Sequence, residues 1–204
     1  MPDIKTLFVT KLYRAALIDA AALNKDLAVA CRDLAAHDGA GQAWSKDKGY
    51  KGYTSYASLN DLPKRDPAFA DLKKQLDKHA AAFGKDLHLD LGGRKLTLDS
   101  LWVNVLEPGG VHTGHIHPHS VISGTYYVEI PSGSSALKFE DPRLPLMMAA
   151  PPRGMDAPEA ERSFIYIQPA AGELLMWESF VRHEVPPNTA KKPRLSVSFN
   201  YRWG

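Results

Sequence analysis

The chain has 204 residues, of which 44% are hydrophobic and 24% charged, and its formal net charge is +2. This is the composition of an ordinary globular protein, and so small a net charge gives no reason to expect a nucleic-acid partner. The single cysteine excludes an internal disulfide, the N-terminal residues do not resemble a signal peptide, and no apolar run approaches the roughly 20 residues that span a bilayer. We therefore predict a cytoplasmic protein without a membrane or nucleic-acid partner.

Apolar residues at helical spacing predict two amphipathic helices in the first half of the chain. The first covers roughly 16–36 and is ended by Asp38-Gly39. The second begins at Asp66-Pro67, where aspartate can cap and proline suits the first helical position, and it is stopped by Gly84. The segment between them, 40–65, is rich in Gly, Tyr and Ser, and we expect an ordered loop packed through its tyrosines.

From about Lys95 the apolar period changes to two, which indicates strands. Turn residues separate the predicted strands, which are 95–107, 121–130, 136–141, 163–169, 172–179, 181–187 and 194–203. About seven or eight short strands of this kind predict a jelly roll. Residues 141–163 contain five prolines and show no clear period, so we expect a long loop of the kind that can close over an active site.

The predicted fold is α+β but mainly β, in a single domain over residues 1–204. Residues 1–95 form a helical buttress and residues 96–204 a cupin-like jelly-roll core. Amphipathic helices need a partner for their apolar faces, so we expect them to pack along one sheet. The same faces could instead bury a homodimer interface, and the sequence does not decide between the two.

Histidines gather where the predicted strands begin. His115 and His117 flank one residue, so in an extended segment both side chains point to the same side and can share one metal ion. His183 is the distant histidine in the β-rich half that can complete the site. Imidazole suits iron, zinc, copper and nickel alike, so ligand type does not select the metal. We assign no ligand role to His112, which we expect to be exposed, or to His119, which could lie behind the ligands.

An anion clamp is predicted eleven residues after His183. Arg194 begins the last predicted strand and shares one face of it with Ser196, Ser198 and Asn200. An arginine fork can bind a carboxylate with two hydrogen bonds, and a serine two residues later can assist. A metal site with a fixed cation beside it suits a 2-oxo acid that chelates the metal at one end and pairs with arginine at the other.

These motifs resemble those of the 2-oxoglutarate/iron(II) dioxygenases. The blocks "HIHPHSVISGTYYV" and "RHEV…RLSVSFN" carry the resemblance most specifically, and "LFVTKLYRAAL" and "GYTSYASL" extend it over nearly the whole chain. More narrowly, the chain is similar to a family of small 2-oxoglutarate-dependent oxygenases of bacteria and phages. The resemblance implies a double-stranded β-helix that uses Fe(II) as cofactor and 2-oxoglutarate as co-substrate. It also implies oxidation, most simply hydroxylation, of a small-molecule or peptide substrate, with release of succinate and CO2.

Carried over by position, the resemblance makes His115 the proximal and His183 the distal metal ligand. Arg194 would pair with the C5 carboxylate of 2-oxoglutarate, with Ser196 assisting. Tyr127 would donate its hydroxyl to the same carboxylate, or Tyr126 if the strand has the opposite phase.

The chain departs from the superfamily pattern at position 117, where a histidine replaces the usual carboxylate. Either the site has three histidine ligands, which we favour, or His117 lies behind two ligands. In both cases iron(II) would keep its full charge among neutral side chains.

Two other interpretations remain open at this stage. One is a cupin-type metalloprotein that does not use 2-oxoglutarate, although Val121 and Ile122 stand where the first cupin motif has a glutamate. The other is a non-enzymatic jelly-roll binding module. Arg194 has no necessary role in the cupin interpretation, and the binding-module interpretation predicts no binding of a 2-oxo acid. Trp102, Asn104 and Trp177 are candidate pocket walls in the oxygenase interpretation.

Overall fold

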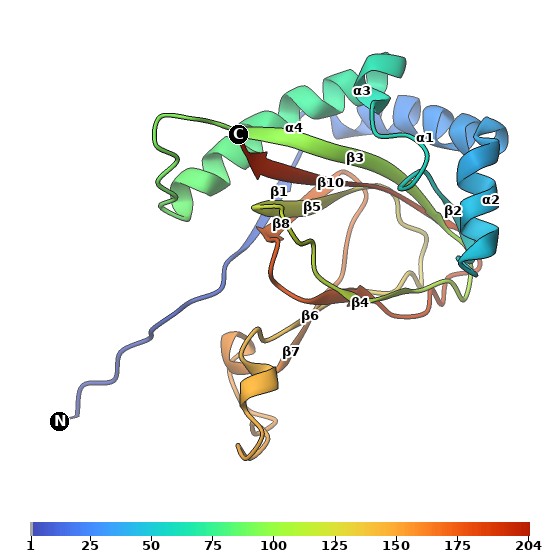
Figure 1. Cartoon of the computed structure of the whole chain (residues 1–204). Coiled ribbons are helices and arrows are strands. Elements are labelled where there is room, and N and C mark those ends of the chain that lie inside the picture. Colours follow the sequence, from blue (N-terminus) through green and yellow to red (C-terminus); the bar gives the residue numbers. More distant parts are fainter. Residues whose placement is uncertain (1) are drawn as a thin grey trace.

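The computed structural model describes residues 2–204 and arranges them as helices packed on two facing antiparallel sheets (Figure 1). The helices are α1 (Ala20–His37), α2 (Gly39–Asp47), α3 (Leu62–Arg65) and α4 (Pro67–Asp86), with short 3-10 turns η1 (Leu144–Leu146) and η2 (Glu159–Glu161). The strands are β1 (Leu12–Ala16), β2 (Gly52–Thr54), β3 (Leu96–Leu106), β4 (His112–His115), β5 (Ile122–Glu129), β6 (Leu137–Glu140), β7 (Phe164–Ile167), β8 (Glu173–Glu178), β9 (His183–Val185) and β10 (Arg194–Trp203).

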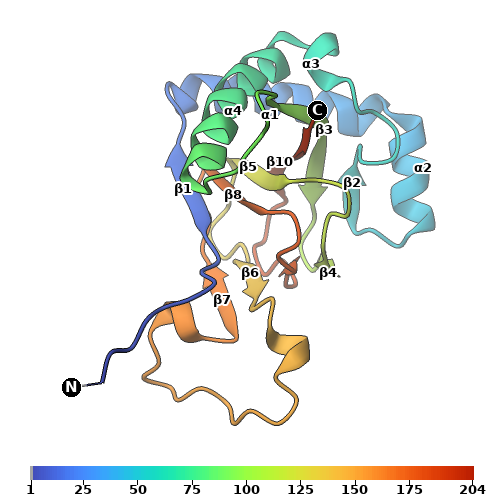
Figure 2. The same cartoon turned by 60° about the vertical axis from the view of Figure 1, so that its left-hand side comes forward.

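The larger sheet has the strand order β1-β8-β5-β10-β3-β2, and α1 and α4 cover its outer face (Figure 2). The apolar stripes of both helices and alternate residues of the central strands form one buried cluster. Each fully buried Leu or Phe in such a cluster contributes about 1.5–3 kcal/mol of burial free energy. The helices therefore fix the position of the larger sheet, as we predicted.

The smaller sheet, β4-β9-β6-β7, faces the other side of the larger one. A second apolar cluster lies between the sheets; it consists of Leu106, Tyr127, Leu137, Phe139, Leu175, Trp177, Val181 and Val185. Two facing antiparallel sheets are the jelly-roll arrangement predicted from the sequence.

Strand β10 separates the two environments along its length. Leu195, Val197 and Phe199 belong to the cluster under the helices. Arg194, Ser196, Ser198 and Asn200 line a cavity between the sheets. This is the strand phase that the sequence indicated, and it turns the polar face of β10 inward rather than toward solvent.

The prediction that 40–65 is a loop is wrong. Helix α2 follows α1 directly, because the Asp38 side chain accepts a hydrogen bond from the Gly41 amide and caps a new helix. Gly39 and Gly41 are poor helix formers, so the local sequence carries no helical signal here. Gly41 is nevertheless needed, because a Cβ at this position would come within 2.9 Å of the Tyr53 ring. Strand β2 and helix α3 also lie in this segment.

Two further boundaries differ from the prediction. Residues 12–16 form strand β1 at the edge of the larger sheet, so α1 begins only at Ala20. Helix α4 passes through Gly84 and ends at Asp86. Gly84 is buried, and a Cβ there would lie 2.9 Å from a methyl group of Leu96, so this glycine serves close packing rather than helix termination.

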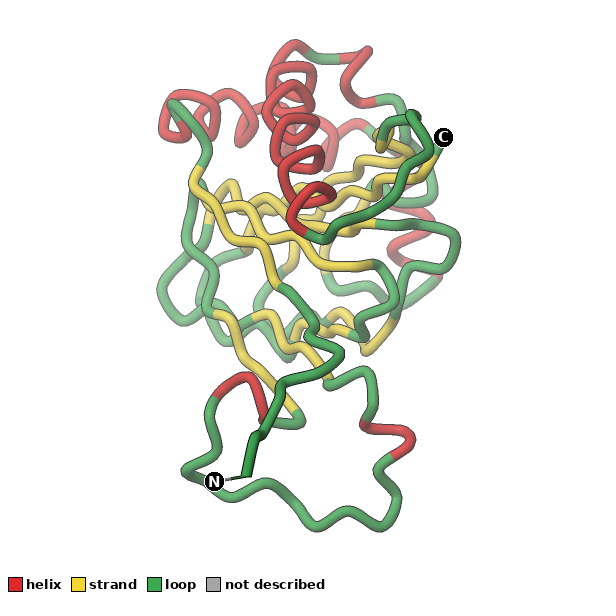
Figure 3. Tube along the Cα trace, turned by 90° about the vertical axis from the view of Figure 1, so that its left-hand side faces the viewer, coloured by secondary structure: helices red, strands yellow, loops and turns green. Residues whose placement is uncertain are grey.

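Residues 141–163 connect β6 to β7 and extend away from the two sheets (Figure 3). Within residues 2–204, no part of this loop lines the cavity between the sheets. The structure thus gives the loop no place as a lid over that cavity. Among all the helices of residues 2–204, none is both long and apolar enough to cross a membrane.

Candidate metal centre and anion pocket

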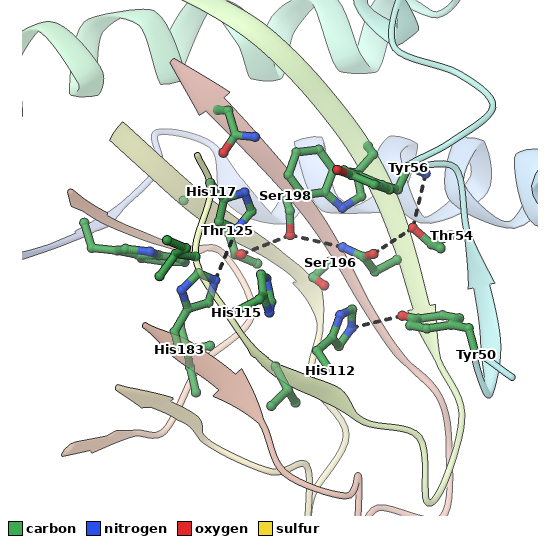
Figure 4. A pocket seen from close by; sticks show the side chains of 18 of the residues that line it. Tyr50, Thr54, Tyr56, His112, His115, His117, Thr125, His183, Ser196 and Ser198 are labelled. Atoms are coloured by element: carbon green, nitrogen blue, oxygen red, sulfur yellow. Dashed lines mark hydrogen bonds between the residues drawn. The ribbon is translucent and has the colours of Figure 1, made fainter. Parts of the chain in front are cut away.

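Three histidines that line the cavity between the sheets lie close together (Figure 4). One ring nitrogen from each of His115, His117 and His183 lies within 4.8 Å of the other two. His115 and His183 are paired across β4 and β9. His117 lies just beyond the end of β4, where its amide donates to the Ser179 carbonyl. The shared side that we expected for His115 and His117 therefore arises although regular strand structure ends at His115.

The ring orientations of two of these histidines are fixed by backbone carbonyls. The Nδ1 of His115 lies 2.6 Å from the Thr113 oxygen, and the Nδ1 of His183 lies 3.0 Å from the Val181 oxygen. A carbonyl can only accept, so each Nδ1 carries the proton and each Nε2 keeps its lone pair free. Metal-binding histidines in proteins are typically held in this way.

The surroundings of His117 and His183 keep these two imidazoles neutral. Burial, and then the neighbouring His115, lowers the pKa of His117 to about 4. Burial, followed by His115, lowers the pKa of His183 to about 3. A neutral imidazole is the form that binds a metal ion.

The three side chains fit one ion. The Nε2 atoms of His117 and His183 are 3.3 Å apart, a separation that one ion at roughly 2.0–2.1 Å from each nitrogen can bridge. The ring of His117 is also stacked on Trp102, with centroids 5.9 Å apart. This residue set could hold a divalent transition metal.

A buried cation lies in the same cavity. Arg194 is 3% exposed and donates one hydrogen bond, to the Ser135 carbonyl at 3.1 Å. Within residues 2–204 no acidic side chain lines its cavity, although a buried charge without a partner is costly. An anionic ligand in the cavity would supply the missing charge.

Hydroxyl groups surround this cation. Tyr127 is fully buried, its hydroxyl has no hydrogen-bond partner in the described chain, and the Arg194 guanidinium lies 5.4 Å from its ring centre. Burial raises the pKa of Tyr127 to about 12, so its hydroxyl remains a donor. Ser196 is opposite Tyr127 in the sheet and lines the same cavity. Tyr126 instead points to the helices and donates to Asn24.

The expectation that His112 is exposed is wrong. Its ring lines the cavity and lies 2.9 Å from the Tyr50 hydroxyl. Burial, and then Arg194, lowers the pKa of His112 to about 3. His119 lies outside the cavity-lining set and is exposed.

The first half of the chain supplies cavity walls that the sequence did not reveal. These are Trp44 from α2, Tyr50, Thr54 from β2, and Tyr56. The tyrosine-rich stretch was visible in the sequence, but its tyrosines were expected to serve packing only. The three candidate walls Trp102, Asn104 and Trp177 all line the cavity, whose volume is about 390 Å³, within the usual range for small-molecule sites.

A family model described as "Putative 2OG-Fe(II) oxygenase" matches residues 100–200, which contain all the histidines of the cluster and Arg194. No curated protein matches the chain significantly.

Solved structures share the fold. A prolyl-4-hydroxylase of Pseudomonas putida has a TM-score of 0.58 at 18% identity, over 95% of this chain and 92% of its own. A prolyl hydroxylase of Trichoplax adhaerens, solved with a hypoxia-inducible-factor peptide, has a TM-score of 0.62 at 14% identity, covering 94% and 83%. HygX of Streptomyces hygroscopicus, solved with nickel and 2-oxoglutarate, has a TM-score of 0.60 at 12% identity, covering 95% and 82%. At these identities the similarity establishes the double-stranded β-helix fold.

Proposed function

Because this chain belongs to the 2OG-Fe(II) oxygenase family, we propose that it hydroxylates a substrate C–H bond at the histidine cluster, using iron(II) and 2-oxoglutarate. His115, His117 and His183 hold the iron in this proposal. Arg194, Tyr127 and Ser196 bind the C5 carboxylate of 2-oxoglutarate. The observation that carries it is the buried, unpaired Arg194 in the same cavity as three converging imidazoles. The cupin alternative gives Arg194 no necessary role, and the binding-module alternative predicts no binding of a 2-oxo acid.

When bound, iron(II) and 2-oxoglutarate supply the oxidising chemistry: dioxygen is consumed, the oxo acid becomes succinate and CO2, and one oxygen atom is transferred to the substrate. The residues of this chain supply position. The carbonyls of Thr113 and Val181 hold two imidazole rings with Nε2 toward the ion, and Trp102 supports the third by stacking. Such orientation by outer partners sharpens both affinity and geometry at metal sites.

The side chains of the carboxylate clamp lie on the cavity face of the larger sheet. Arg194 is fixed by the Ser135 carbonyl, and the unpartnered Tyr127 hydroxyl gains an acceptor when a carboxylate binds. The apolar cluster around Leu137, Leu175 and Val185 excludes water from this end of the cavity. In such surroundings a charge-assisted pair is stronger than in water.

The test is an anaerobic titration of 2-oxoglutarate into the iron(II)-loaded protein, observed through the visible metal-to-ligand charge-transfer band. We expect a saturable band. In Arg194→Ala the affinity should fall roughly a hundredfold or more, because one partner of a buried charge pair is removed. The metal content of this variant should stay near that of the wild type.

Arg202→Ala is the matched control, since Arg202 is exposed on the same strand and outside the cavity; it should bind 2-oxoglutarate normally. His183→Ala should lose iron. Equal 2-oxoglutarate affinity in Arg194→Ala and wild type would remove the clamp, and full iron loading of His183→Ala would remove His183 as a ligand.

A further inference from the structure

The cavity between the sheets has no acidic side chain among its described lining residues, while Arg194 contributes a permanent positive charge. The acids closest in sequence to His183, and those of the neighbouring strand, point elsewhere. Glu184 pairs with Lys138 at 2.8 Å, and Glu140 pairs with Arg182 at 3.3 Å. Glu184 alternates with His183 along β9, so it lies on the opposite face of the smaller sheet.

The missing acid leaves a charge imbalance. Three neutral imidazoles surround the place of the ion, and His117 stands where a carboxylate would remove one positive charge. Iron(II) brings two positive charges, 2-oxoglutarate two negative ones, and Arg194 one more positive charge. The loaded site therefore has one uncompensated positive charge, whether or not His117 itself touches the ion. Beside the buried His183 such a charge is costly.

A second observation concerns Trp177, which the proposed function leaves unused. Its side chain is 2% exposed, its indole N–H has no hydrogen-bond partner in the described chain, and it lines the cavity. The ring centre lies 4.6 Å from that of His183. Buried donors are nearly always paired in folded proteins, so an anionic oxygen bound near the histidines would satisfy a group that the chain itself leaves open.

The other described residues that line the cavity present only neutral groups to a substrate. Thr54, Asn104 and Ser198 form a chain of hydrogen bonds across three strands, with distances of 3.0 Å for both links (Figure 4). Tyr56 packs edge-on against Trp102 at 5.2 Å. These groups can donate hydrogen bonds or stack, but none can neutralise the positive charge.

From these observations we infer that the substrate itself carries one negative charge: it is a small carboxylic acid whose carboxylate lies near the histidine cluster and compensates the acid that this site lacks. The inference rests on the proposed function, because the charge count includes iron(II) and 2-oxoglutarate. A cavity of about 390 Å³ restricts the part of the substrate that enters to small-molecule size.

The test uses acetate and acetamide, which have the same shape and differ in charge. Each is titrated into the anaerobic iron(II)–2-oxoglutarate complex, with the charge-transfer band and the heat of binding as readouts. We expect acetate to perturb the band saturably, without loss of 2-oxoglutarate, and acetamide to have no effect at the same concentrations. Equal effects of the two, or loss of the band through displacement of 2-oxoglutarate, would overturn the inference.

Two charge variants sharpen the result. Asn104→Asp places a carboxylate in the cavity with almost no change of shape and should weaken acetate binding roughly tenfold or more. Should that variant fail to fold, Ser198→Asp compared with Ser198→Asn gives the same contrast from the adjacent strand. Acetate affinity that is indifferent to the added carboxylate would contradict the inference. Absence of the band before any acetate is added would instead refute the proposed function, and the inference with it.

Discussion

Tyr126 and Tyr127 are neighbours on β5 whose hydroxyl groups have opposite surroundings. The Tyr126 hydroxyl donates to Asn24 on α1 at 2.6 Å, and burial raises its pKa to about 12. The Tyr127 hydroxyl faces the cavity beside Arg194 and has no hydrogen-bond partner among residues 2–204. Successive side chains of a strand point to opposite faces of the sheet. Tyr126 therefore packs toward the helices, whereas the neighbouring Tyr127 is available to a ligand in the cavity.

This pair gives a residue-scale prediction. Tyr127→Phe should weaken 2-oxoglutarate binding roughly tenfold, the equivalent of one hydrogen bond to a charged acceptor, and leave the unfolding free energy unchanged or raised. Tyr126→Phe should do the reverse: normal affinity, with a loss of about 0.5–1.5 kcal/mol in stability. Titration of the charge-transfer band and urea unfolding of both variants measure the two effects. An exchange of phenotypes would show that Tyr126 is the ligand-binding residue.

At the scale of elements, α2 depends on a single carboxylate. Asp38 caps the helix through the Gly41 amide and also accepts from the hydroxyls of Tyr53 and Ser58. Burial by itself would raise the pKa of Asp38, but the hydrogen bonds from Ser58, Gly41 and Tyr53 outweigh burial and hold the pKa below its usual range. Helix α2 matters for the site because it brings Trp44 to the cavity.

We therefore expect Asp38→Ala to lower the free energy of unfolding by about 0.5–2 kcal/mol, the range for loss of an N-cap. Because the pKa of Asp38 is lower in the folded than in the unfolded protein, its charge stabilises the fold above the unfolded carboxyl pKa. That contribution is lost as the pH falls through the folded pKa. Urea unfolding of wild type and Asp38→Asn at neutral and acidic pH should show a difference that shrinks in acid; a difference that is constant with pH would contradict this linkage.

At the scale of the whole molecule, the 141–163 loop is separate from the site. The loop connects β6 and β7, which are neighbouring strands of the smaller sheet. At the ends of these strands Glu140 pairs with Phe164, and the Asp141 amide donates to the Ser163 carbonyl. Exposed apolar side chains such as Met148 and Met155 gather in the loop, and none of its residues lines the cavity.

Replacing residues 144–160 by a short Gly-Ser turn should therefore leave 2-oxoglutarate affinity unchanged, because the strand register of β6 and β7 is fixed at their ends. The measurement is the same anaerobic titration, with thermal unfolding as a check on folding. A large loss of affinity in a folded variant would show that the loop closes over the cavity when the ligands bind.

Both halves of the chain contribute residues to the site, so the first 95 residues do more than support the jelly-roll core. The first half contributes β1 and β2 to the larger sheet and Trp44, Tyr50, Thr54 and Tyr56 to the cavity. It is more than a buttress. A single domain over residues 1–204 remains our prediction, and the walls shared by both halves favour it.

Local pattern was enough to predict the jelly roll, the two long helices, the inward polar face of β10 and the grouping of His115, His117, His183 and Arg194. Each of these follows from side-chain period or from motif spacing, which are properties of neighbouring residues in the chain. The family resemblance of the same motifs added the iron(II) and 2-oxoglutarate prediction, and the family match to residues 100–200 agrees with it.

Only the tertiary structure decided which side chains share the cavity. The His112 ring forms a hydrogen bond with the hydroxyl of Tyr50, a residue 62 positions earlier. The Asp38 carboxylate that caps α2 is held by hydrogen bonds from the hydroxyls of Tyr53 and Ser58, which lie beyond the helix in the chain. That no described lining residue of the cavity is acidic is likewise decided by the tertiary structure, which pairs Glu140 and Glu184 with other side chains. Contacts between distant segments set these features, and a period or a local motif contains no information about them.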